Sequence, residues 1–187
     1  ATNDTDVDTA SGSLVYSLSN SVAGLTIGTG GAYTFNPGNT ANDSLAVGQT
    51  TVVTGTYLVT DGQGGTATST LTITVTGTND APVANAATGS ATEGGANVTG
   101  NLTATDPDSG ATLTYSLANT VAGLSIGSNG AYTFNPTNTA YDNLAAGATT
   151  VVTGTYLVSD GLGGTGTSTL TITVTGTNDA PVANAAT

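Results

Sequence analysis

The feature that most constrains this chain is an internal repeat of domain size. The segment GTNDAPVANAAT occurs at residues 77–88 and again at 176–187, a shift of 176 − 77 = 99 residues. The same shift places AYTFNP at 32–37 on 131–136 and VVTGTYLV at 52–59 on 151–158. Around the first acidic cluster the shift becomes 100, because Asp6 and Asp8 match Asp106 and Asp108. A unit of this length can bury its own core, so the sequence predicts two tandem domains.

Apolar and polar residues alternate with a period of two inside each unit. The alternation is clearest at residues 68–76, and residues 14–18 and 51–59 are also typical of strands. Glycine-rich segments at 28–31, 61–65 and 127–130 separate these runs, and no helical stripe is present. The pattern predicts an all-β fold of two β-sandwich modules. The aromatic residues that recur in both units are expected in the two cores: Tyr33, Phe35, Tyr57, Tyr132, Phe134 and Tyr156.

The charge balance excludes most catalytic chemistry. The chain has no Lys, Arg, His, Cys, Met or Trp, and its twelve acidic residues give a net charge of −12. It therefore lacks a nucleophile–base pair built on His, a zinc or haem ligand set, and a cationic clamp for phosphate. A carboxylate pair for glycoside hydrolysis would have to flank a cleft, whereas these acids lie in repeated loops. We expect no enzymatic activity and no nucleic-acid partner.

The acidic excess also indicates what the chain does bind. No side chain can neutralise the clustered Asp residues, so a divalent cation from solution is the expected counter-ion, and calcium prefers such oxygen ligands. No apolar run approaches the roughly 20 residues that cross a bilayer, so direct membrane insertion is not expected.

Two stretches, DGQGGTATSTLTITVTGTNDAPV and ATDPDSGATLTYSL, resemble the VCBS-type, cadherin-like repeats of large bacterial surface adhesins. The resemblance spans essentially both units. It implies cadherin- or Ig-like β-sandwich modules in a linear rod, an extracellular or cell-surface location, and a part in cell adhesion, biofilm or filament formation. The DxNDNxP linker of cadherins is matched by residues 77–82, but its first Asp and last Asn are missing here.

The resemblance further implies calcium ligands, residue by residue. The junction between the two units is expected to use Asn79, Asp80, Asp106, Asp108 and Asp160. Half-sites are expected at the two ends, from Asp6, Asp8 and Asp61 and from Asn178 and Asp179, with Glu93 beside the latter pair. Gathered carboxylates without a cation repel one another, which favours a metal. The alternative is that these segments are plain turns and loops, which residue propensity alone explains.

The two units differ at their starts. Residues 81–100 precede the acidic loop of the second unit, whereas the first unit begins almost at its acidic loop. We expect residues 1–80 to be a repeat lacking its first strand, 81–179 a complete repeat, and 180–187 the first strand of a following repeat or a donated strand. Either the chain is a window on a long array, or each subunit donates its tail to the open sandwich of the next.

The sequence thus predicts a structural spacer segment of an extracellular bacterial adhesin or matrix filament, rigidified by Ca²⁺ at its junctions. Two alternatives stay open: a filament subunit joined head to tail by donor-strand complementation, and a glycan- or cell-binding module. Near-identical units favour the spacer, because recognition would need loops specific to one unit. The expected partners are neighbouring copies of the same repeat, covalent or head to tail, and cell-surface or matrix components.

Overall fold

The computed structural model describes residues 4–181 and 183, and its contacts separate the chain into two units. Unit 1 comprises Ala1–Asn79 with Pro107–Gly110, and unit 2 comprises Asp80–Asp106 with Ala111–Thr187. Strands hold 44% of the residues and helix only 2%, which confirms the all-β prediction. No helix in the described part of the chain is long and apolar enough to cross a membrane.

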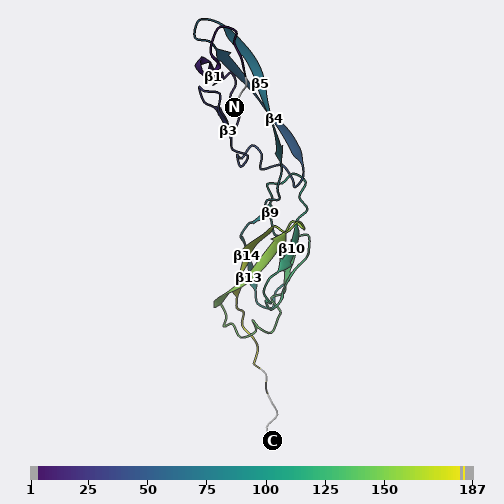
Figure 1. Ribbon diagram of the computed structural model, residues 1–187. Helices are drawn as coiled ribbons and strands as arrows, with labels where there is room; N and C mark the ends of the chain where they lie inside the picture. The colour runs from purple at the N-terminus through teal and green to yellow at the C-terminus, as the bar shows by residue number, and fades with distance from the viewer. Residues whose placement is uncertain (1–3, 182, 184–187) are drawn as a thin grey trace. The chain divides into compact units, whose positions relative to one another are not determined.

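Unit 1 is built around one long hairpin (Figure 1). Its elements are η1 (Ser11–Ser13), β1 (Val15–Leu18), β2 (Leu25–Ile27), β3 (Tyr33–Phe35), β4 (Thr50–Thr60) and β5 (Thr66–Thr76). The strands form a three-stranded sheet in the order β1-β4-β5 and a separate β2-β3 pair, all antiparallel. The β2 strand packs on β4. The Leu25 side chain of β2 lies so close to Gly55 of β4 that a Cβ at Gly55 would overlap it.

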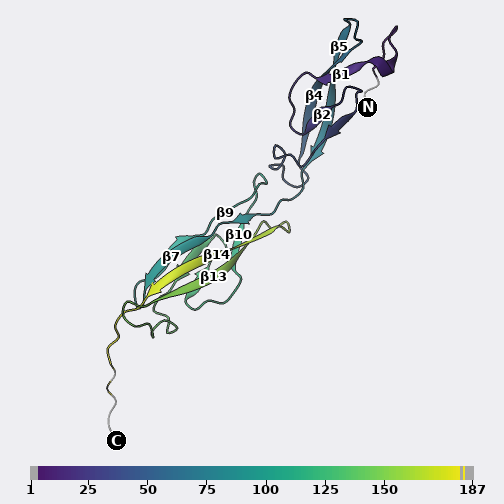
Figure 2. The ribbon, with the colours of Figure 1, turned by 90° about the vertical axis from the view of Figure 1, so that its left-hand side faces the viewer.

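Unit 2 repeats this pattern and adds strands before it. Its elements are β6 (Val83–Ala84), β7 (Ala87–Thr92), β8 (Val98–Asn101), β9 (Ala104–Thr105), β10 (Thr114–Leu117), β11 (Leu124–Ile126), β12 (Ala131–Phe134), β13 (Thr149–Ser159) and β14 (Thr165–Thr175). The sheets are β10-β13-β14-β7, β11-β12-β8 and β6-β9. The β7 strand runs parallel to β14, from Ala87 opposite Leu170 to Thr92 opposite Thr175 (Figure 2). The described residues of unit 1 hold no counterpart of β7 or β8.

The added strands change how deeply the shared hairpin is buried. In unit 2 the residues of β14 that face the core, Leu170, Ile172 and Val174, are almost fully buried. Their counterparts in β5 are less enclosed, and Leu71 and Ile73 are only half-buried. The main buried cluster of unit 1 is limited to Leu14, Tyr16, Tyr57 and Val59. Burial of apolar side chains drives folding, so unit 2 has the larger stabilising core.

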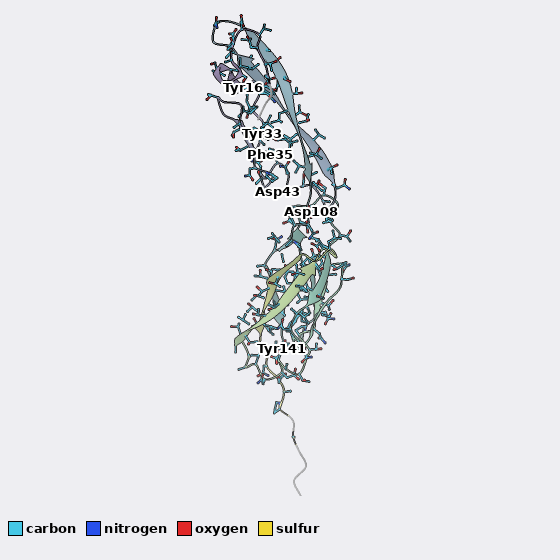
Figure 3. All side chains as sticks on the ribbon, in the orientation of Figure 1. Tyr16, Tyr33, Phe35, Asp43, Asp108 and Tyr141 are labelled. Carbon is cyan, nitrogen blue, oxygen red and sulfur yellow. The ribbon has the colours of Figure 1, made fainter. Side chains whose placement is uncertain are left out.

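One aromatic prediction is wrong for the same reason. Tyr33 is 42% exposed, whereas Tyr132 is 8% exposed at the matching position. In unit 2 the β8 strand covers β12, with Gly100 opposite Tyr132 and the Tyr132 ring occupying the place of a Gly100 Cβ. Tyr33 and its neighbour Phe35, labelled in Figure 3, have no such strand over them among the described residues. The other predicted core aromatics are buried or half-buried.

Candidate metal centre

The acidic cluster at the start of unit 1 begins with a tight turn. Asp6 Oδ1 accepts the backbone N–H groups of Asp8 at 3.1 Å and Thr9 at 2.9 Å. Hydrogen bonds from the Asp8 side chain and from these amides lower the pKa of Asp6, while the shared hydrogen bond and the negative charge of Asp6 raise the pKa of Asp8. The two carboxyl groups therefore titrate as a pair, and a cation would relieve their repulsion.

Asp61 stands near this pair at the turn between β4 and β5. Its Oδ1 accepts the backbone N–H of Gln63 at 2.7 Å and of Gly65 at 2.9 Å. The turn needs glycine, since Gly62 and Gly64 have φ of +76° and +109°. The negative charge of Asp61 adds a minor contribution to the raised pKa of Asp8. The structure thus gives Asp61 a turn-forming role and places it near the other two residues of the predicted half-site, Asp6 and Asp8.

Asp4 belongs to the same region and was missed by sequence reasoning. Its two carboxylate oxygens lie 3.1 and 3.3 Å from the Tyr57 hydroxyl, which donates to them. Asp4, Asp6 and Asp61 all line one cavity of about 220 Å³. The sequence contains little indication of Asp4. When the two repeats are aligned with the shift of 100 residues that applies around this acidic cluster, Asp4 matches Ala104, which has no carboxylate.

Glu93 is the most enclosed of the predicted ligands. It is only 4% exposed, follows β7, and donates its backbone N–H to the Thr175 carbonyl at 2.9 Å. Its Oε2 accepts the backbone N–H of Thr177 at 2.8 Å, whereas its Oε1 is buried without a hydrogen-bond partner in the described structure. Thr177 directly precedes Asn178 and Asp179, which are exposed. The structure therefore brings Glu93 to the segment expected from the sequence.

The predicted junction residues are divided between unit 1 and unit 2. Asn79 and Asp108 belong to unit 1, and Asp80, Asp106 and Asp160 to unit 2. Each of the five takes part in interactions within the structure. The loop that carries Asp108 is held in unit 1 by a hydrogen bond from the Ser109 N–H to the Ser44 carbonyl at 3.2 Å. The calcium site that the sequence predicts from these five junction residues stays a prediction.

Asp160 repeats the turn role of Asp61. Its Oδ1 accepts the backbone N–H of Leu162 at 2.7 Å and of Gly164 at 3.0 Å, and the residue is buried. Within the described residues, no group of three or more acidic side chains lies in an arrangement that could hold a metal ion. The donor chemistry nevertheless fits calcium, because the buried Glu93 carboxylate has an oxygen left over and the chain offers no cation of its own.

Comparison with known proteins gives one family result and one fold result. A family described as bacterial cadherin-like domain matches residues 79–176, and one described as bacterial Ig domain matches residues 1–74. A search of curated proteins found no match.

Among solved structures, mouse Cadherin-23 EC22-24 covers 92% of the chain at 14% identity with a TM-score of 0.54. Human CDH23 EC21-23 covers 89% at 17% identity with a TM-score of 0.54, and Drosophila N-cadherin EC1-4 covers 91% at 19% identity with a TM-score of 0.51. The matches cover 56%, 59% and 42% of those structures, so the chain spans about half of their length. At sequence identities of 14%, 17% and 19%, this structural likeness establishes the fold alone.

Proposed function

The chain belongs to the family of bacterial cadherin-like domains, and from this premise we propose that it is a structural spacer segment of an extracellular adhesin or matrix filament, stiffened by Ca²⁺ at its inter-domain junctions. The near-identity of the two units supports a spacer, because repeated modules add length without adding a new recognition surface. The proposed partners are neighbouring copies of the repeat and cell-surface or matrix components.

The observation that carries the calcium proposal is Glu93. A carboxylate that is 4% exposed is costly to bury unless its charge is compensated. One oxygen is compensated by the Thr177 N–H, and the other has no hydrogen-bond partner in the described structure. Since the chain contains no Lys, Arg or His, the compensating cation has to come from solution. Glu93 with Asn178 and Asp179 would hold it at one end of unit 2.

The same chemistry extends to the predicted junction residues, namely Asn79, Asp80, Asp106, Asp108 and Asp160. Carboxylate and amide oxygens are the ligands that calcium takes, six to eight at a time. Extracellular modules bind calcium with dissociation constants of roughly 0.1–1 mM, so such sites fill outside the cell and empty inside it. The role of calcium here would be mechanical: it cross-links carboxylates from neighbouring segments and restricts bending.

Melting the chain with calcium and with chelator tests this function. We expect about 2 mM calcium to stabilise unit 2 by about 2 kcal/mol if the dissociation constant is near 0.1 mM. Glu93→Gln keeps the shape of the side chain and should lose most of that stabilisation. The matched control Asp142→Asn removes an exposed carboxylate of unit 2 and should keep it. Equal calcium responses of the two variants would contradict the role of Glu93.

The alternative of a self-assembling filament subunit is favoured by one specific observation. The edge of β5 has no strand beside it in the described structure, whereas the same edge of β14 is covered by β7. An exposed strand edge is a template for strand addition from another chain. A head-to-tail contact of this kind repeats without closing and produces filaments.

A further inference from the structure

The turn between β11 and β12 of unit 2 has the sequence Gly-Ser-Asn-Gly, residues 127–130. The Gly130 N–H donates to the Gly127 carbonyl at 2.9 Å, and the Gly127 N–H donates to the Ala131 carbonyl at 2.8 Å. Gly130 has a φ of +84°, a conformation that favours glycine. Asn129 is exposed, and it is the only Asn in the chain that Gly follows directly. The turn therefore presents an Asn–Gly pair to solvent.

An Asn–Gly pair holds a nucleophile and an electrophile next to each other. The backbone nitrogen of the glycine can attack the side-chain amide carbon of the asparagine and close a small ring. The attack is intramolecular, so no second molecule has to be positioned. Glycine has no Cβ that would hinder the approach. This reactivity is one reason why asparagine counts among the thermolabile residues.

The folded turn affects this reaction in two opposite ways. Asn129 Oδ1 accepts the Ala131 N–H at 3.1 Å. Negative charge develops on this oxygen when the amide carbon is attacked, and a hydrogen-bond donor already aimed at it stabilises that charge. The hydrogen bond from the Gly130 N–H to the Gly127 carbonyl has to open first, which lowers the rate about tenfold. The first effect offsets part of the second.

We propose that Asn129 is a site of spontaneous modification in the folded chain, with water as the only co-reactant. The Gly130 nitrogen loses its proton to solvent and bonds to Asn129 Cγ. The Cγ–Nδ2 bond then breaks, and Nδ2 takes up protons from water and leaves as ammonia. Water opens the ring at Cγ to give an aspartate, or at the main-chain carbonyl carbon to give an isoaspartate. Ammonia is lost to solvent, so the modified fraction increases with the age of the chain.

The isoaspartate product affects unit 2 because Gly130 is closely packed. The Gly130 carbonyl accepts the Leu102 N–H at 2.8 Å. A Cβ at Gly130 would lie 3.0 Å from the Leu102 carbonyl oxygen and 3.3 Å from the Tyr115 ring, so little space remains there. An isoaspartate adds a methylene to the backbone at residue 129 and displaces Gly130 from this position. An aspartate keeps the backbone length and an oxygen for the Ala131 N–H.

Unit 1 forms the same turn without the reactive side chain. Its residues 28–31 are Gly-Thr-Gly-Gly, and Gly30 matches Asn129 at the shift of 99. The Gly31 N–H donates to the Gly28 carbonyl at 2.9 Å, and Gly31 has a φ of +77°. The substitution Asn129→Gly therefore gives unit 2 the turn of unit 1 and serves as the matched control. Asn129→Asp supplies the aspartate product directly.

Ageing the full chain in warm, mildly alkaline buffer tests the proposal. Hydroxylamine cleaves the closed ring, so it should split the chain after residue 129, and intact mass reports the replacement of the amide by a hydroxyl. We expect the folded chain to react at a rate within about tenfold of the same chain unfolded in urea. Asn129→Gly should show no such cleavage. The aged chain should melt at a lower temperature than the fresh chain, whereas Asn129→Asp should melt with the fresh chain.

Three results would overturn the proposal or its consequence. A folded chain that reacts more slowly than the tenfold limit would show that the turn protects Asn129. An equal mass gain in Asn129→Gly would assign the reaction to other asparagines. An aged chain that carries isoaspartate and melts like the fresh chain would refute the displacement of Gly130. Each measurement can be made in chelator, so the failure of this proposal and the failure of the calcium function are distinguishable.

Discussion

Leu71 of unit 1 and Leu170 of unit 2 stand at the same position of two nearly identical sequences, yet only Leu170 is fully buried. Tyr33 and Tyr132 differ in the same direction. Both differences arise where β7 and β8 cover the sandwich of unit 2 and no described strand covers that of unit 1. The burial of a strand is thus determined by the neighbour it acquires as well as by its own sequence.

The largest expected difference in stability comes from truncating a core leucine in each unit. Leu170→Ala should destabilise unit 2 by about 3 kcal/mol, because it leaves a cavity in an enclosed core. Leu71→Ala should destabilise unit 1 by only about 1 kcal/mol, because the half-buried side chain already contacts solvent. Hydrogen exchange read by mass spectrometry reports on each unit separately. Equal losses in the two units would refute the claim that β7 accounts for the difference.

A second substitution pair tests the close approach of the chain to β14. Gly166→Ala should destabilise unit 2 by about 2 kcal/mol, since the new methyl group overlaps the Pro82 carbonyl. The reciprocal Ala67→Gly should cost unit 1 about 1 kcal/mol or less, from backbone freedom alone. Urea unfolding followed by circular dichroism measures both. If Gly166→Ala were neutral, Pro82 would not be held against β14.

Removing the hydroxyl of Tyr156 or of its counterpart Tyr57 should give a smaller difference in stability between the two units. Tyr156→Phe removes a hydrogen bond to the Asn85 carbonyl and should cost about 1 kcal/mol. Tyr57→Phe removes the contact with the carboxylate of Asp4, near the surface, and should cost less.

Burial raises the pKa of both tyrosines above 10.0, so the folded state holds the phenol proton more tightly than the unfolded chain does. The stability linked to these protons is complete below pH 10 and is lost as the pH rises above it. Each Phe variant should weaken this alkaline loss in its own unit. An unchanged alkaline loss would show that other groups cause it.

The smallest expected effect concerns the carboxyl pair Asp6 and Asp8. Asp6 should titrate at lower pH than Asp8, because hydrogen bonds lower the pKa of the first while the first raises that of the second. The Asp6 shift stabilises the fold above its unfolded pKa of 3.8, and the Asp8 shift does the opposite, so the net effect on unfolding is small. Carboxyl carbon shifts in NMR measure the order. Calcium at the half-site should lower both values, and insensitivity of both would argue against a metal there.

Part of this structure was predictable because it depends on local patterns. The alternation at residues 68–76 predicts β5 and its repeat predicts β14, and the glycine-rich segment 61–65 marks the turn between β4 and β5. The resemblance to cadherin-like repeats of bacterial adhesins is confirmed by the family match. The bounds of the predicted segments 1–80, 81–179 and 180–187 stay predictions, as do the calcium ligands.

What could not be predicted depends on contacts between distant segments. The exposure of Tyr33 follows from the strand that is not beside it, and periodicity within β3 contains no information about that. The contact of Asp4 with Tyr57 joins residues 53 positions apart at the point where the repeat shift changes. The clash that distinguishes Ala67 from Gly166 appears only once the path of Pro82 is known.

The most direct test of the spacer function is small-angle scattering of the full chain in about 2 mM calcium and in chelator, at concentrations where sedimentation shows a monomer. The account predicts that calcium increases the maximum dimension and narrows the distribution of conformations, and that Asp106→Asn combined with Asp108→Asn abolishes the change. Identical scattering with and without calcium would contradict a calcium-stiffened junction.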